Sequence, residues 1–123
     1  MPNRILRESI CTSPTIEGLT WFEEVCFYRL LVHCDDYGRM EARPAVLRSR
    51  LFPLREDVES TQVRDAVDRL AQVGLLDLYE VCGREFLELR TWNQYQRVRN
   101  KRSKYPLPPW APEEEWQQAE EVF

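Results

Sequence analysis

The chain has 123 residues, of which 43% are hydrophobic and 31% are charged. This size and composition are typical of one globular domain with an apolar core. The longest apolar run, Val25–Tyr28, has four residues, whereas a helix that spans a membrane needs about 20. The first residues also lack the apolar segment of a secretory signal, so we expect a cytoplasmic protein.

Charge is distributed in three blocks. Residues 1–89 carry 11 basic and 16 acidic side chains, residues 90–105 carry six basic and no acidic ones, and residues 106–123 carry five glutamates and no base. These blocks predict a folded domain over 1–89 with an N-terminal arm over 1–19, a basic aromatic extension over 90–105, and a proline-rich linker with an acidic tail over 106–123.

The four cysteines lack the spacing of a zinc site and, without a secretory signal, are expected to be reduced. If Cys26 and His33 share one helix, they lie about 10 Å apart along its axis, which is too far to bind one ion. We therefore expect no metal site and no cofactor.

The N-terminal arm is predicted to contain a short helix or extended segment over Arg4–Ile10, followed by a loop with Ser13, Pro14 and Gly18.

A central helix is predicted from Thr20 to about Cys34 or Asp35. Thr20 and Glu23 have the spacing of a capping box. Apolar residues surround this helix almost completely, which is typical of a helix buried on several sides. It is therefore either the centre of the domain or also part of a subunit interface, and we expect Trp21 and Phe22 at its start to belong to the core.

After a turn, Arg39–Ala42 is predicted to be extended, and a second helix follows over Ala45–Leu51, with Pro44 at a first position that tolerates proline. A third helix begins near Ser60 and ends at Gly74, with apolar residues at three- and four-residue steps.

Two strand-like runs, Leu75–Val81 and Arg84–Leu89, flank Cys82 and Gly83. Gly83 suits the positive φ of a tight hairpin, but Cys82 does not, which allows a turn looser than two residues. The order helix, short strand, helix, helix and hairpin predicts an α+β fold, the winged helix-turn-helix, in which the third helix is the recognition helix and the hairpin is the wing.

Several motifs are distinctive in combination: Trp21–Val25, Asp35–Pro44, Leu75–Gly83, Trp92, Gln96 and Arg97–Pro106. Together they resemble the N-terminal domain of phage-encoded replication proteins of Gram-positive bacteria, the replisome-organiser or DnaD-like group. The resemblance covers roughly residues 3–106. It implies a winged-helix module in a bacterial host cell that works in the initiation of DNA replication, where such modules bind DNA, self-associate or contact other replication proteins.

The exposed face of the third helix offers candidate DNA contacts, namely Thr61, Gln62, Arg64 and Arg69. Glutamine and arginine can make bidentate contacts to base edges in the major groove. However, Asp65 and Asp68 on the same face would oppose phosphates, and each can pair with an arginine four residues away. The face is therefore either a DNA reader or a solvated surface suited to docking a protein. Arg84, next to the hairpin turn, is a further candidate for backbone or minor-groove contact.

The basic extension is the stronger candidate, because cations interleaved with Trp92, Tyr95 and Tyr105 can neutralise phosphates while rings stack on bases. Its candidate contacts are Arg97, Arg99, Lys101, Arg102 and Lys104. In the alternative interpretation the rings pack against the domain and the cations are neutralised by the glutamates of the tail.

The tail suggests a further hypothesis, in which it folds onto the extension and competes with DNA, so that removing residues 107–123 raises the affinity. Trp110 and Trp116 in this part are typical of a segment that docks on a partner or on the domain itself.

The sequence contains no phosphate loop, dinucleotide fingerprint, metalloprotease helix or serine elbow. It predicts no catalytic residues and a DNA-binding module that acts in phage or prophage replication as a homo-oligomer, most simply a dimer. The alternative is an oligomerisation or protein-docking module of the same machinery with little direct DNA contact.

Overall fold

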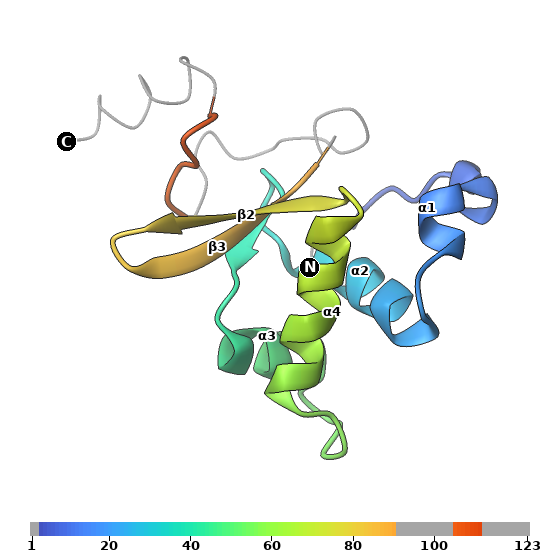
Figure 1. Cartoon of the computed structure of the whole chain (residues 1–123), viewed down its shortest axis with the longest axis horizontal. Helices are drawn as coiled ribbons and strands as arrows, with labels where there is room; N and C mark the ends of the chain where they lie inside the picture. Colours follow the sequence, from blue (N-terminus) through green and yellow to red (C-terminus); the bar gives the residue numbers. More distant parts are fainter. Residues whose placement is uncertain (1–2, 91–104, 112–123) are drawn as a thin grey trace.

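The computed structural model describes residues 3–90 and 105–111. They form an α+β fold with four α-helices, one 3-10 helix and a three-stranded antiparallel sheet (Figure 1). In chain order the elements are η1 (Glu8–Thr12), α1 (Pro14–Glu17), α2 (Trp21–His33), β1 (Arg39–Glu41), α3 (Pro44–Leu51), α4 (Ser60–Gln72), β2 (Leu76–Val81) and β3 (Arg84–Leu89). This order is compatible with the winged-helix-like arrangement that the sequence predicts. Within the described ranges, the helices are too short or too polar to cross a membrane.

The sheet has the strand order β1-β3-β2, and both outer strands run antiparallel to the central β3. Leu76 lies opposite Leu89, and both belong to the core between the sheet and the helices. Tyr79 lies opposite Phe86 on the other face, because side chains alternate between the two faces along a strand. Figure 1 shows α3 and α4 below the sheet and residues 105–111 above it.

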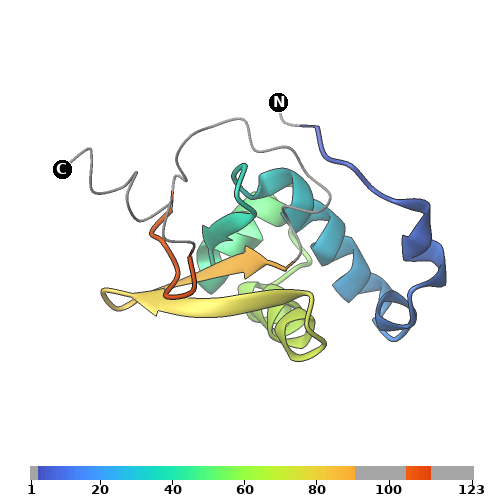
Figure 2. The same ribbon diagram turned by 90° about the horizontal axis from the view of Figure 1, so that it is seen from above.

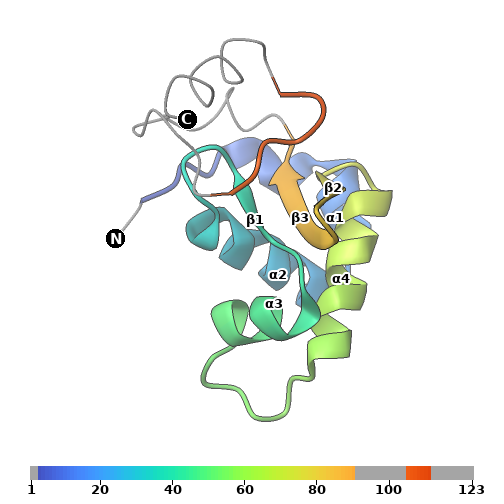
Figure 3. The same ribbon diagram turned by 90° about the vertical axis from the view of Figure 1, so that its left-hand side faces the viewer.

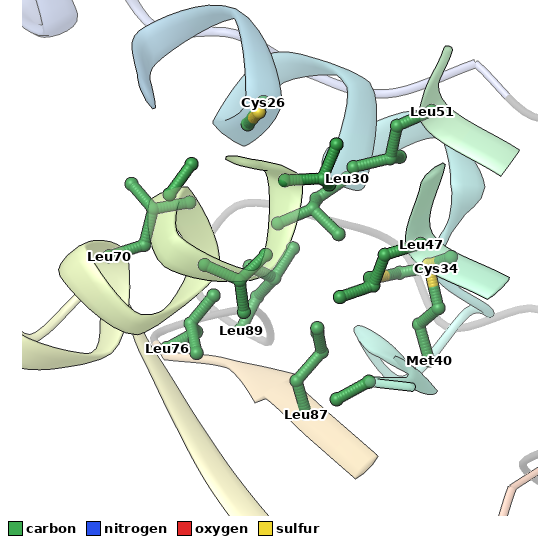
Figure 4. Packing of buried hydrophobic residues seen from close by; sticks show 14 of the residues in the cluster. Cys26, Leu30, Cys34, Met40, Leu47, Leu51, Leu70, Leu76, Leu87 and Leu89 are labelled. Carbon is green, nitrogen blue, oxygen red and sulfur yellow. The ribbon is translucent and has the colours of Figure 1, made fainter. Parts of the chain in front are cut away.

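The core is built where α2, α3 and α4 meet the inner face of the sheet (Figure 4). Its fully buried members include Leu30 from α2, Leu47 from α3, Leu70 from α4 and Leu87 from β3. The buried residues of α4 recur at three- and four-residue steps, as the sequence predicts, so that one stripe of this helix faces the core. Burial of such side chains contributes roughly 1.5–3 kcal/mol each.

The four cysteines are free thiols in two environments. Cys26 and Cys34 are buried in the core, and burial raises the pKa of Cys26 to about 12 and that of Cys34 well above its ordinary value. Cys11 and Cys82 are exposed.

Helix α2 begins with the predicted capping box. The Thr20 hydroxyl accepts from the Glu23 backbone N–H at 3.2 Å, and the Glu23 carboxylate accepts from the Thr20 N–H at 2.9 Å. Phe22 is partly buried and stacks on Phe52, with ring centroids 5.2 Å apart. The prediction that Trp21 belongs to the core is wrong, because its side chain is 85% exposed. Adjacent residues on a helix point about 100° apart. Because Phe22 points toward the domain, Trp21, one position before it, points toward solvent.

The N-terminal arm contains more helix than the sequence indicates. The predicted loop around Ser13 and Pro14 is instead the start of α1, where the Ser13 hydroxyl accepts from the Ile16 N–H at 3.4 Å and proline occupies the first helical position. Before it, Arg4 donates to the carbonyl oxygens of Leu31 at 2.9 Å and Cys34 at 2.8 Å. The arm thereby satisfies carbonyl groups that the last turn of α2 leaves without helical partners.

The hairpin turn has two residues, so the looser turn that the sequence allowed is not formed. Val81 is paired with Arg84, and both Cys82 (φ 53°) and Gly83 (φ 78°) adopt positive φ. Positive φ at both central positions is typical of a type I′ turn, whose twist matches that of the strands. Cys82 accepts the left-handed conformation because the register of the hairpin leaves only two residues for the turn.

Candidate nucleic-acid interface

Two of the predicted DNA contacts lie at the exposed start of α4. Thr61 and Gln62 both face solvent. The Gln62 side-chain oxygen accepts from the backbone N–H of Glu59 at 2.8 Å, and Glu59 in turn caps the helix with its carboxylate. Gln62 therefore completes a capping box. Its side chain can contact a base edge only if the hydrogen bond from the Glu59 N–H is broken. Arg69 is half-buried further along α4 and donates to Gln72 at 3.1 Å.

Arg64 is bound to three groups of the domain. Its guanidinium donates to the carbonyl of Ala42 at 3.0 Å, to Asp68 at 2.9 Å and to Glu85 at 2.6 Å. These partners belong to α4, to the chain after β1 and to β3, and the arginine side chain is only 19% exposed. Hydrogen bonds to the two carboxylates raise the pKa of Arg64 against the opposing effect of burial. This arrangement ties α4 to the β2–β3 hairpin.

The surface around α4 is acidic. Residues 55–72 contain three arginines and five acids, and the acids Glu56, Asp57, Glu59, Asp65 and Asp68 are all exposed. Since Arg64 and Arg69 are partly buried, the outward charge of this helix is negative. Negative charge opposes the phosphates on either side of a major groove.

Arg84 lies next to the hairpin turn and forms a positive patch with Arg43. The Arg84 guanidinium is 3.2 Å from one carboxylate oxygen of Glu41 and stacks 5.5 Å from the Phe86 ring centroid, while Arg43 is 3.2 Å from the other oxygen of Glu41. Both arginine side chains are more than half exposed, so one carboxylate holds two accessible cations. Arg43 is not among the DNA contacts predicted from the sequence. The signal that could have identified it is its position directly before Pro44, between β1 and α3.

The five cations of the basic extension lie outside the described residues: Arg97, Arg99, Lys101, Arg102 and Lys104. The residues on either side are described and pack on the sheet. Arg90 donates twice to the carboxylate of Asp77, at 2.9 and 2.6 Å. Tyr105 packs against Phe86 with ring centroids 6.3 Å apart, and burial raises the pKa of its hydroxyl. Both ends of segment 91–104 are therefore attached to the folded domain.

Residues 105–111 cover the outer face of the sheet (Figure 3). Tyr79 donates its hydroxyl to the Pro106 carbonyl at 2.7 Å, and Trp110 donates its indole N–H to Glu88 at 2.8 Å. Glu88 also accepts from the buried Arg39 at 2.7 Å. The interpretation that Trp110 docks on the domain itself is confirmed, whereas Trp116 lies outside the described residues.

The described ranges contain no group of three His, Cys, Asp or Glu side chains arranged to hold a metal ion. His33 is exposed at the end of α2, and burial of its ring together with nearby Arg50 and Arg29 lowers its pKa. Its surroundings are therefore basic.

Comparison with protein-family models, with curated proteins and with solved structures gave no match.

Proposed function

We propose that this chain is a noncatalytic DNA-binding module with a winged-helix fold, in which α3 and α4 form the helix-turn-helix and β2 and β3 form the wing. Its place in the initiation of phage or prophage DNA replication rests on the resemblance of its sequence motifs. In this proposal the DNA is held mainly by segment 91–104, with Arg43 and Arg84 as additional phosphate contacts.

The attachment of the basic segment at both ends carries the proposal. Arg90 and Tyr105 bind to the sheet, so 14 residues with five cations and no acid begin and end on the folded domain. A chain held at two points loses less conformational entropy when it binds than a free tail does. Five cations that neutralise phosphates release condensed counterions from the DNA, which is sufficient for salt-sensitive binding to a duplex.

In the same proposal α4 is not the principal phosphate contact. Its exposed charged side chains are acidic, and Arg64 and Gln62 already bind groups of the domain. Thr61 and Arg69 remain candidates for base-edge contact after the basic segment has placed the domain on the DNA. This order agrees with the general division of roles, in which phosphate contacts position a protein and base contacts specify the sequence.

The second candidate function is an oligomerisation or protein-docking module. The acidic surface of α4 and the exposed apolar residues of α2 favour it, since neither surface is suited to DNA.

Fluorescence anisotropy with a labelled duplex and the matching single strand, titrated with salt, tests the proposal. The variant replaces all five cations of segment 91–104 with glutamine, and Arg55→Gln, an exposed arginine on the loop before α4, is the matched control. For duplex DNA we expect the slope of log K against log salt to become smaller in magnitude by about 4.5 in the five-site variant. The slope of the control should not change.

Failure to bind either DNA at low salt, or an unchanged slope in the five-site variant, would contradict the proposal and favour the docking function. The hypothesis of a competing tail is best tested by removing residues 112–123, because residues 107–111 cover the sheet and their loss would expose its outer face. Unchanged affinity after this truncation would refute the competition.

A further inference from the structure

Helix α2 presents an apolar stripe to solvent on the side opposite the core. Trp21 is 85% exposed, Val25 37% and Val32 45%. At 100° per residue, these three residues and Tyr28, which is partly buried and also packs against the core, fall within about 60° of one another around the helix. Their spacing of four, three and four residues is the spacing of a seam between two helices. Buried Cys26 and Leu30 lie on the opposite side.

The two flanks of this stripe carry opposite charge. On one flank Glu17 and Glu24 line a groove of about 600 Å³ between α2 and the η1–α1 region, together with Trp21 and Tyr28. Figure 2 shows α1 beside the first turn of α2. The Tyr28 hydroxyl donates to Glu24 at 2.7 Å, which fixes the carboxylate beside the stripe.

The other flank is basic. Arg29 lies there, held in place by a 2.8 Å hydrogen bond to the Leu51 carbonyl and by the Phe52 ring, whose centroid is 4.5 Å away. His33 follows one turn later, with Arg50 near it. The stripe is therefore bordered by acids on one side and by bases on the other.

We propose that the α2 stripe is the contact surface for a second copy of this chain, with the two α2 helices packed side by side in the same direction. A two-fold axis parallel to the helices places the acidic flank of each copy against the basic flank of the other. Glu24 then lies across from Arg29 of the partner subunit, five positions further along, which is the spacing of interhelical ion pairs in parallel coiled coils. An antiparallel pair would instead place each acidic flank against itself.

The residue types in the α2 stripe fit packing against a second copy of this chain. Val25 and Val32 take the positions where β-branched residues favour two-stranded parallel packing. The helix has only 13 residues, so the contact is small, and we expect a dimer with a dissociation constant in the micromolar range, roughly 1–100 μM. The proposed contacts come from α2 and not from the cations proposed to bind DNA, so the dimer and the DNA binding are tested independently.

Sedimentation velocity of the full chain over a range of concentrations tests the surface. We expect Trp21→Ala with Val25→Ser to weaken the dimer at least 10-fold, while the matched control Leu54→Ser, which changes an exposed apolar residue on the loop between α3 and α4, leaves it intact. Circular dichroism shows whether each variant is folded. A wild-type chain that is monomeric throughout, or a dimer that the stripe variant leaves unchanged, would overturn the proposal.

Charge reversal and cross-linking test the orientation. Glu24→Arg should weaken the dimer about 10-fold, whereas Glu80→Arg, the same change at an exposed position of β2, should not. In a chain with the exposed thiols removed by Cys11→Ser and Cys82→Asn, Val32→Cys should cross-link on mild oxidation, because equivalent positions meet in a parallel pair. An antiparallel pair separates them by about 16 Å. A dimer without the Val32→Cys cross-link would refute the parallel arrangement.

Discussion

Replacement of Arg64 with glutamine distinguishes a structural role for this arginine from a role in DNA binding. The guanidinium joins Ala42, Asp68 and Glu85 through contacts of 3.0, 2.9 and 2.6 Å. Both carboxylates are about half exposed, so each ion pair contributes only about 0.3–0.5 kcal/mol. The hydrogen bond to the carbonyl of the buried Ala42 contributes about 1 kcal/mol, and its loss leaves that acceptor without the guanidinium.

We therefore expect Arg64→Gln to lower the free energy of unfolding by about 1.5–2 kcal/mol. Urea denaturation followed by circular dichroism measures this change, and Arg55→Gln, at an exposed position, should stay within about 0.5 kcal/mol of the wild type. Fluorescence anisotropy, measured under conditions in which Arg64→Gln is folded, should show the same slope of log K against log salt for DNA binding as in the wild type. The reasoning would be refuted by an unchanged unfolding free energy combined with a slope reduced by about 1, which is the loss expected for a phosphate contact.

Three further predictions follow from the described contacts. Cys82→Asn should raise the unfolding free energy by about 0.5 kcal/mol, because asparagine adopts positive φ more readily than cysteine. If urea denaturation shows a lower unfolding free energy for this variant, the result would contradict the type I′ turn. Trp110→Ala should lower the unfolding free energy by about 1 kcal/mol through loss of the Glu88 hydrogen bond and of ring packing; no change would show that this segment does not stabilise the domain. Burial raises the pKa of both Cys26 and Cys34, so their reactive thiolate forms are suppressed near pH 8. A thiol reagent should therefore label two sites per native chain and four after denaturation, and rapid labelling of all four in the native state would contradict the buried core.

Much of the fold could be read from local sequence patterns. The capping box of Thr20 and Glu23 marks the start of α2, and the apolar spacing after Ser60 marks α4 and its buried face. Both signals depend on residues within one or two helical turns, where geometry is set by hydrogen bonding and periodicity. The loop predicted at Ser13 and Pro14 was wrong because both residues are also typical of a helix start.

The candidate interface was less predictable, because side-chain partners come from distant parts of the chain. Sequence spacing pairs Arg64 with Asp68 but gives no indication that Glu85 and the Ala42 carbonyl also bind it. The core placement of Trp21 failed for a related reason. An apolar residue at the start of an apolar helix is assigned to the core by composition, but its direction depends on which side of the helix the rest of the domain covers.

The sequence by itself determined the order of the elements from α2 to β3, the separation of charge into three blocks and the basic character of segment 91–104, because these are properties of neighbouring residues. Only the tertiary structure decided which charged groups are available for binding. Strand pairing brings Arg84 and Arg43 to one carboxylate, folding of residues 105–111 onto the sheet attaches the end of the basic segment, and packing of α2 on one side leaves its opposite stripe exposed. Each of these depends on contacts between residues far apart in the chain, and such contacts are fixed by burial of the shared core rather than by local sequence.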